Sequence, residues 1–218
     1  MNVTGDRARV LVAERDRPTR AGLRLLLVRE GFDIAGEAID AREAVDMSIA
    51  ERPDVALVAA ELPGGGIEAA RRISSAVART RLVVLTSHPS GEELVDAVMA
   101  GAVGYLGRNV SLERLPAILR GVLAGEVALP RRHSRHLVEA LRRQDARRSR
   151  LAAQTDAVLS DREWEVLQLV ADGLPTGEMS RRLGISEVTA RRHISSVMAK
   201  LGVSDRAGAA ELLRRSSR

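Results

Sequence analysis

Arginine and carboxylate side chains are the groups with which this 218-residue chain could do chemistry. The chain has no cysteine, which excludes disulfide bonds, thiolate zinc sites and thiol catalysis. His133 and His136 have the i, i+3 spacing of two metal ligands, but no carboxylate or third histidine completes a set, so we expect no metal and no cofactor. No nucleophile and base are arranged together, which makes an enzyme the least favoured class. Partner binding and carboxylate or phosphate chemistry remain.

The charge of the chain is unevenly distributed along its length. Residues 1–129 carry a net charge of −2 and residues 130–218 a net charge of +7, and 33 of the 34 basic residues are arginine. A basic second half indicates a polyanionic partner, most simply nucleic acid, although a general bias towards arginine is an alternative explanation. No apolar run approaches the roughly 18 to 20 residues of a membrane span, so we expect a cytoplasmic protein without a membrane partner.

Short apolar runs alternate with helical periodicity through the first 124 residues, which predicts a mostly parallel sheet with helices on both faces. The expected strands are Val10–Ala13, Ile34–Ala38, Val55–Ala60, Leu82–Leu85 and Val103–Leu106. The expected helices are Thr19–Glu30, Ala41–Glu51, Ile67–Val77, Glu92–Ala100 and Leu112–Ala124. Asp40 with Glu43 forms a capping box, and Gly31 and Gly101 follow helix ends. Ligands of such sheets bind beyond the carboxyl ends of the strands, here the first and third.

Sequence motifs follow the expected strands and the first helix of this half. They are Arg9–Arg15, Gly22-Leu23, Pro53–Ala59, Leu85–Ser87 and Gly101–Leu106. On these motifs, residues 8–124 resemble the receiver domain of a two-component response regulator. The resemblance implies an α/β, flavodoxin-like, doubly wound fold with five parallel strands.

The resemblance also implies a phosphorylation pocket, which this sequence alters. Receivers of the family use an aspartate at the end of the third strand as the phosphoryl acceptor, and an acidic pair after the first strand holds magnesium. Here Ala59 stands at the aspartate position, the acidic pair is Glu14 and Arg15, and the lysine after the fifth strand is Arg108. These four positions carry +1 instead of −2, so we expect neither aspartyl phosphate nor bound magnesium.

Four other residues belong to this degenerate pocket. Asp16 and Glu61 are nearby acids, but neither restores the missing nucleophile. Thr86 and Tyr105 stand at the two switch positions of the family, although ordinary packing would also explain both.

A guanidinium is expected to replace the metal. We expect Arg15, with or without Arg108, to occupy the space of magnesium and phosphate beside Glu14. Such a pocket would hold the two switch residues in one conformation, or would leave a cleft for an unknown small acidic ligand. A decayed pocket with Arg15 in solvent is the alternative.

The C-terminal residues have the pattern of a helix-turn-helix. Ser160 and Glu163 form a capping box, and Gly173 follows the helix that they open. Thr176 is expected to cap a short second helix, Gly184 to supply the turn, and the residues from 186 to 201 to form a capped third helix. The expected apolar face of the first helix is Val166, Leu167, Leu169 and Val170, and that of the third is Ala190, Ile194, Val197 and Leu201.

On this pattern, residues 159–212 resemble a LuxR-type helix-turn-helix of the NarL/FixJ class, whose third helix lies in the major groove of DNA. The positions that match DNA-contacting or helix-bracing positions of the family are Thr189, Arg191, Arg192, His193, Ser195 and Lys200. Arg191 and Arg192 could each pair with guanine or phosphate, while Ser195 is a weaker partner than the lysine often found there.

The remaining segments complete the domain organisation. A last helix, about Asp205–Arg214 with Ser204 as its cap, occupies the dimerisation position of the family, where Glu211, Leu212 and Leu213 are expected to matter. Residues 125–158 form an arginine-rich linker with a short amphipathic helix near residues 136–141 and a polar tether beyond it. We therefore divide the chain into a degenerate receiver (1–124), this linker (125–158) and a DNA-binding domain (159–218).

The sequence thus predicts a transcription regulator that binds a promoter inverted repeat in double-stranded DNA as a homodimer, without phosphorylation. Three alternatives stay open: a conventional phosphorylated regulator with another acceptor, an interaction module that heterodimerises with another response regulator, and an enzyme. Phosphotransfer assays test the first and co-purification the second.

Overall fold

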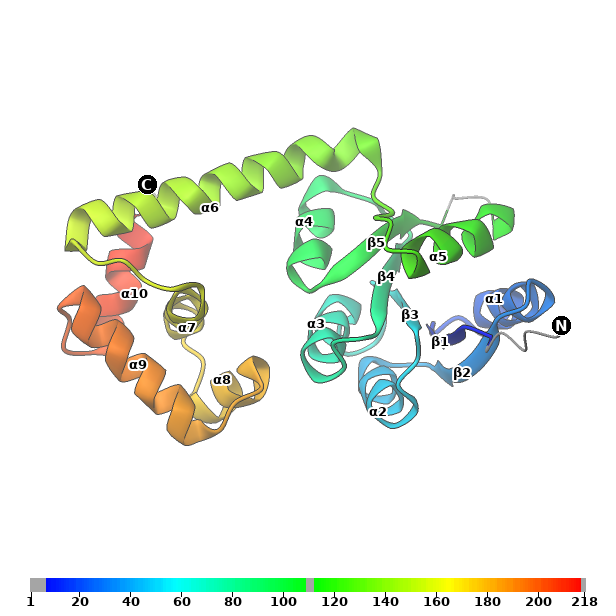
Figure 1. The fold of residues 1–218 in the computed structure, drawn as a ribbon, viewed down its shortest axis with the longest axis horizontal. Helices are drawn as coiled ribbons and strands as arrows, with labels where there is room; N and C mark the ends of the chain where they lie inside the picture. Colours follow the sequence, from blue (N-terminus) through cyan, green and yellow to red (C-terminus); the bar gives the residue numbers. More distant parts are fainter. Residues whose placement is uncertain (1–6, 109–111, 217–218) are drawn as a thin grey trace, which may run out of the picture. The chain divides into compact units, whose positions relative to one another are not determined.

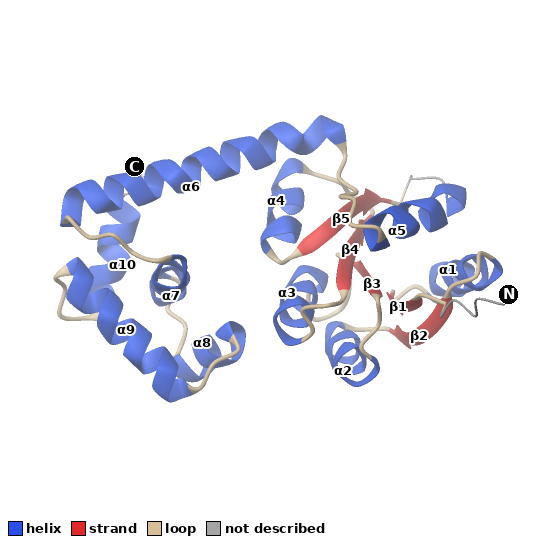
Figure 2. Cartoon of the chain, in the orientation of Figure 1, coloured by secondary structure: helices blue, strands red, loops and turns tan. Residues whose placement is uncertain are grey.

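The computed structural model describes residues 7–108 and 112–216 and divides into two compact units, residues 1–137 and residues 138–218 (Figure 1). Strands occur in the first unit, while the described part of the second is helical (Figure 2). No helix among the described residues is both long and apolar enough to cross a membrane.

A five-stranded parallel sheet forms the centre of the first unit, in the order β2-β1-β3-β4-β5. Its strands are β1 (Arg9–Ala13), β2 (Asp33–Ala38), β3 (Val55–Ala59), β4 (Arg81–Thr86) and β5 (Ala102–Gly107). The strand order reverses at β1, because β2 and β3 pair on opposite sides of it, and Ala13 lies opposite Val58. The carboxyl ends of β1 and β3 are therefore neighbours, as the doubly wound fold class requires.

Helices cover both faces of the sheet (Figure 1). They are α1 (Arg17–Arg29), α2 (Ala41–Glu51), α3 (Gly66–Ala76), α4 (Gly91–Met99) and α5 (Leu115–Leu123), with a 3-10 turn at Leu112–Arg114. Buried side chains of α2, α3 and α4 pack with Leu11 and Val84 on one face, and those of α1 and α5 pack with Val10 and Val12 on the other. Both faces of the central strands β1, β3 and β4 are buried, which explains their nearly continuous apolar sequences.

Local signals account for most helix boundaries. Helix α1 begins at Arg17, two residues earlier than expected. Asp16 caps it by accepting hydrogen bonds from Thr19 N at 3.0 Å and from Thr19 Oγ1 at 2.7 Å. Asp40 caps α2 through Glu43 N at 2.8 Å, but the Glu43 carboxylate accepts from Ile39 N, so the expected capping box is only half formed. Gly31 and Gly101 have positive φ after their helices, as expected.

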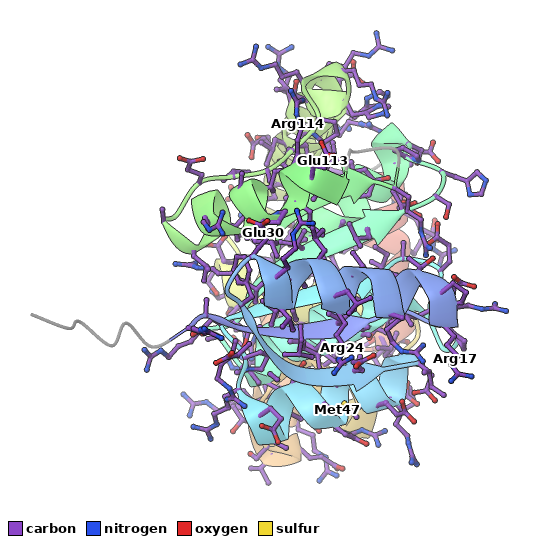
Figure 3. All side chains as sticks on the ribbon, turned by 90° about the vertical axis from the view of Figure 1, so that its right-hand side faces the viewer. Arg17, Arg24, Glu30, Met47, Glu113 and Arg114 are labelled. Carbon is purple, nitrogen blue, oxygen red and sulfur yellow. The ribbon has the colours of Figure 1, made fainter. Side chains whose placement is uncertain are left out.

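Charged residues connect α1 to β2 and to α5 on one face of the sheet. Figure 3 labels Arg17, Arg24 and Glu30 along α1 and its end. Arg24 Nε lies 3.4 Å from a Glu37 carboxylate oxygen, and Arg120 of α5 donates to the Glu30 carbonyl oxygen at 2.7 Å. Most of these groups are partly exposed, so they position the helices more than they stabilise the fold.

The chain after α5 returns to the edge of the sheet. Tyr105 N donates to Ala128 O at 2.8 Å, and Ala128 N donates to Val103 O at 2.9 Å. Gly104 and Ala128 thereby form a parallel bridge beside β5.

The second unit is a bundle of helices around a separate core. Its helices are most of α6 (Ser134–Thr155), α7 (Asp161–Ala171), α8 (Thr176–Leu183), α9 (Glu187–Leu201) and α10 (Arg206–Arg215). The two apolar stripes predicted for α7 and α9 are buried. Ser160 forms the predicted capping box with Glu163, Ser186 caps α9, and Gly184 ends α8 in the left-handed conformation.

Two predicted caps are wrong. Pro175 precedes α8, and the Thr176 hydroxyl instead accepts a hydrogen bond from Arg206 at 2.6 Å. Asp205, not Ser204, caps α10 by accepting from Gly208 N at 2.7 Å. In each case the N-cap position lies one residue before the expected one or one residue after it, and at α8 its proline makes no side-chain capping hydrogen bond.

The polar tether expected after residue 141 is also wrong, because α6 continues to Thr155. Leu151 is buried in the core of the second unit, and the Arg148 guanidinium lies over the Trp164 ring, 5.2 Å from its centroid. Arg148 also pairs with Asp161 at 2.6 Å, and Arg147 donates to the Leu213 carbonyl oxygen at 3.3 Å. Contacts with the bundle hold this segment in a helix despite its arginines.

Candidate functional site

The carboxyl ends of β1, β3, β4 and β5 form the first candidate site. Ala59 ends β3 and is 1% exposed, so a buried methyl group stands where the receiver family has its phosphoryl acceptor. Glu14 follows β1 and is also 1% exposed, while Thr86 ends β4. Arg108 follows β5 and donates its backbone N–H to Thr86 O at 2.8 Å.

An ion pair occupies the centre of this site. Arg108 Nη2 lies 2.6 Å from Glu14 Oε2 and 3.5 Å from Glu61 Oε2. The contact is an ion pair, and Glu14 Oε2 accepts no hydrogen bond from the residues that the structure describes. Glu14 Oε1 accepts from Asp16 N at 2.8 Å, which fixes the carboxylate.

These residues do not fit the magnesium site of the receiver family. Magnesium binds oxygen ligands in octahedral geometry, usually one or two carboxylates with waters. Here a guanidinium lies against the buried carboxylate of Glu14, and Ala59 has no oxygen in its side chain. Asp16 caps α1, and its hydrogen bonds with Thr19 lower the pKa of its carboxyl.

The prediction for Arg15 requires correction. Arg15 is exposed at the surface, and the arginine that pairs with Glu14 is Arg108. Arg15 lies two residues beyond the end of β1, in the exposed turn that leads to α1, whereas Glu14 beside it is buried.

Glu61 completes the site, although the sequence indicated it only as a nearby acid. Its Oε1 accepts from Ser87 N at 2.5 Å and from the Thr86 hydroxyl at 3.3 Å. The Thr86 oxygen also accepts from His88 N at 3.2 Å, so its one hydrogen is available to Glu61.

Tyr105 is fully buried behind this loop. Its hydroxyl donates to Glu93 Oε1 at 2.7 Å and accepts from Ser90 N at 3.1 Å. Burial raises the pKa of Tyr105 to about 12, and the Glu93 hydrogen bond adds to the shift. The phenol therefore stays protonated at neutral pH and ties β5 to the first turn of α4.

The exposed face of α9 forms the second candidate site. The helical period places five exposed residues on it, Val188, Arg191, Arg192, Ser195 and Ala199. Arg191 forms an exposed ion pair with Glu187 at 3.1 Å, which DNA phosphate or a base could replace at small cost. Two arginines thus lie on an exposed helix face.

The other predicted contact residues are used partly within the domain. Thr189 is half-buried and donates its N–H to the cap residue Ser186 at 3.1 Å, and His193 is half-buried. Lys200 Nζ lies 2.7 Å from Glu163 Oε2, so it braces α9 against α7.

Glu163 is the centre of that brace. Its carboxylate accepts from Lys200, from Ser196 Oγ at 2.8 Å and from Ser160 N at 2.9 Å. The Lys200 contact, followed by the Ser160 backbone hydrogen bond, lowers the pKa of Glu163 to about 2. The orientation of α9 therefore depends on an ionised carboxylate.

Sequence reasoning missed two participants in this unit. Val188 is 74% exposed on the α9 face, and its spacing from Arg191 and Arg192 would have placed it there. The Arg148–Trp164 stack had no local signal, because it joins residues from separate helices.

Comparisons with known proteins define the class of the chain. Residues 10–120 match the response regulator receiver domain, and residues 157–213 match the bacterial regulatory proteins of the luxR family. The chain belongs to the response-regulator family, with a luxR-type domain at its C-terminal end. It is a transcription regulator with a DNA-binding helix-turn-helix.

Individual relatives span nearly the whole chain. The DNA-binding transcriptional activator DevR/DosR of Mycobacterium tuberculosis is 33% identical over 92% of this chain and 90% of its own. The nitrate/nitrite response regulator NarL of Escherichia coli is 29% identical, covering 93% of each chain. The structure of the RcsB–DNA complex matches 96% of this chain and 98% of its own, with a TM-score of 0.55 and 23% identity, and supports the fold.

Proposed function

We propose that this response regulator controls transcription as a dimer on an inverted repeat, without phosphorylation of its receiver domain. The observation that carries the proposal is the strand-end site, where Ala59 offers no acceptor and Arg108 pairs with Glu14. A carboxylate is needed both for an aspartyl phosphate and for the metal that assists its formation. We propose no catalytic activity for this domain.

The DNA contact is assigned to the exposed face of α9. Arg191 and Arg192 are the exposed cations of that face, and an arginine can donate two hydrogen bonds to guanine. Ser195 lies about one turn beyond Arg191, and Thr189, His193 and Lys200 are assigned to backbone contacts or to bracing. DNA was bound by the RcsB relative of the same fold, which supports a similar use of this helix.

The test begins with double-stranded DNA selected from a random pool by the full chain. Arg191→Ala and Arg192→Ala should each weaken binding to the selected sequence by about 1 to 3 kcal/mol if the residue contacts a base. Arg150→Ala, which removes an exposed arginine of α6, is the matched control and should have little effect. Binding should also weaken steeply with salt. Unchanged affinity of the Arg191→Ala, Arg192→Ala double variant would refute the assignment of α9.

A further inference from the structure

Glu61 is an acid that the proposed function does not yet use. It lies two residues beyond β3, and its carboxylate contacts the ends of both neighbouring strands. Ser87 N donates to it at 2.5 Å, Thr86 Oγ1 at 3.3 Å, and Arg108 Nη2 lies 3.5 Å away. A backbone amide, a hydroxyl and a guanidinium therefore converge on one carboxylate.

These three donors form the type of site that binds an oxyanion. All of them are positively polarised, and they lie at the carboxyl edge of the sheet, where ligands of doubly wound folds bind. Partial burial of Glu61 favours its neutral form, but the Ser87 amide and the Arg108 charge outweigh burial and lower the pKa of the carboxyl. Glu61 is therefore an anion at neutral pH.

The same carboxylate fixes the start of the loop that leads to α4. It holds Thr86 and Ser87, and the Thr86 oxygen accepts the N–H of His88. At the other end of this short loop, Ser90 N and Glu93 hold the Tyr105 hydroxyl. Both ends of the loop are therefore tied, one to Glu61 and one to Tyr105.

We propose that Glu61 is a built-in anion, whose carboxylate fills an oxyanion site at the strand ends and holds the β4–α4 loop and Tyr105 in a single conformation. A receiver domain without a phosphoryl acceptor then carries its own negative charge in the site. The inference deepens the proposed function, because it names what replaces the modification, but it can fail separately.

Tyr105 supplies the measurement, since it is the only tyrosine of the chain. The full-length protein labelled with 3-fluorotyrosine should give one ¹⁹F resonance, shifted from that of free fluorotyrosine. In Glu61→Ala we expect the resonance to move towards the free value or to split. Inorganic phosphate or acetate should restore the original resonance in this variant and should leave the unmodified chain unchanged.

Two variants keep the test decisive. Glu61→Gln keeps the shape of the side chain without its charge and should displace the ¹⁹F resonance less than Glu61→Ala does. This variant also provides the test if Glu61→Ala folds poorly. Glu113→Gln removes an exposed carboxylate of the same unit and should leave the resonance in place.

Three results would overturn the proposal: an unchanged resonance in Glu61→Ala, a displacement that neither anion reverses, or a phosphate effect of equal size in the unmodified chain. The second would assign Glu61 to packing alone. Formation of a phosphoprotein would instead refute the proposed function. The ¹⁹F resonance would still decide separately whether Glu61 holds the loop.

Discussion

Ala59 and the Arg108–Glu14 ion pair lie together at the carboxyl ends of the strands. Breaking a buried pair by removing one partner leaves an uncompensated charge, which costs more than the pair itself contributes. Removing Arg108 should therefore destabilise the carboxyl edge of the sheet, because it would leave the buried carboxylate of Glu14 without its cation.

Acetyl phosphate with magnesium should change neither the mass of the protein nor its affinity for DNA. Ala59→Asp alone should not restore phosphorylation, because Arg108 still pairs with Glu14 and Arg15 cannot ligate a metal. Intact-mass spectrometry detects phosphorylation, a DNA titration measures the affinity, and a magnesium titration detects metal binding. A phosphoprotein, or magnesium bound near Glu14 in the unmodified chain, would contradict this interpretation of the site.

Acid should weaken the second unit through Glu163. Its folded pKa of about 2 lies below the usual 4.5, so its stabilising contribution is complete above about pH 5 and is lost as the pH falls towards 2. Glu163→Gln should lower the free energy of unfolding at pH 7 and flatten its pH dependence in that window. Fluorescence of Trp164, the only tryptophan, follows unfolding. An equally steep acid transition in the variant would argue against this role.

Sequence patterns predicted helices and strands correctly where one face of the element is apolar. The stripe from Ala190 to Leu201 predicted the buried side of α9, because a period of 3.6 requires no knowledge of the partner. The sequence predicted Arg15, with or without Arg108, beside Glu14, and it could not decide between them because the pairing depends on side-chain direction at two separate strand ends. The length of α6 depends on Leu151 and Trp164, which meet only in the folded unit.

Leu151→Ala tests whether α6 belongs to the core of the second unit. Because Leu151 is 1% exposed, the substitution should cost about 2 to 5 kcal/mol in the free energy of unfolding. Leu141→Ala, on the same helix but 59% exposed, is the control and should change it by less than about 0.5 kcal/mol. Denaturant titration followed by tryptophan fluorescence measures both, and equal effects would contradict the assignment.

The proposed dimer must form without phosphoryl transfer. The structure changes which residues of α10 can contribute, because Leu213 is buried in the core and Leu212 packs against it. Glu211 is the exposed one of the three predicted positions and pairs with Arg214 at 3.2 Å.

Sedimentation of the unmodified full chain should therefore reveal a dimer, with or without selected DNA. Glu211→Lys should weaken the dimer if α10 lies in the interface, because it leaves two adjacent exposed cations, the introduced lysine and Arg214, on a surface that faces the same surface of a second copy. Glu139→Lys, an exposed reversal on α6, is the matched control. A monomer at high concentration under both conditions would exclude the dimer.

The bridge between Gly104 and Ala128 has a consequence for solubility. An unprotected edge strand offers free N–H and C=O groups to other chains and promotes aggregation. Residues 103–105 are shielded on this side by the chain that follows α5, so a fragment cut at residue 124 would expose the β5 edge. A fragment that ends after Pro130 would retain this protection and should remain monodisperse at higher concentration.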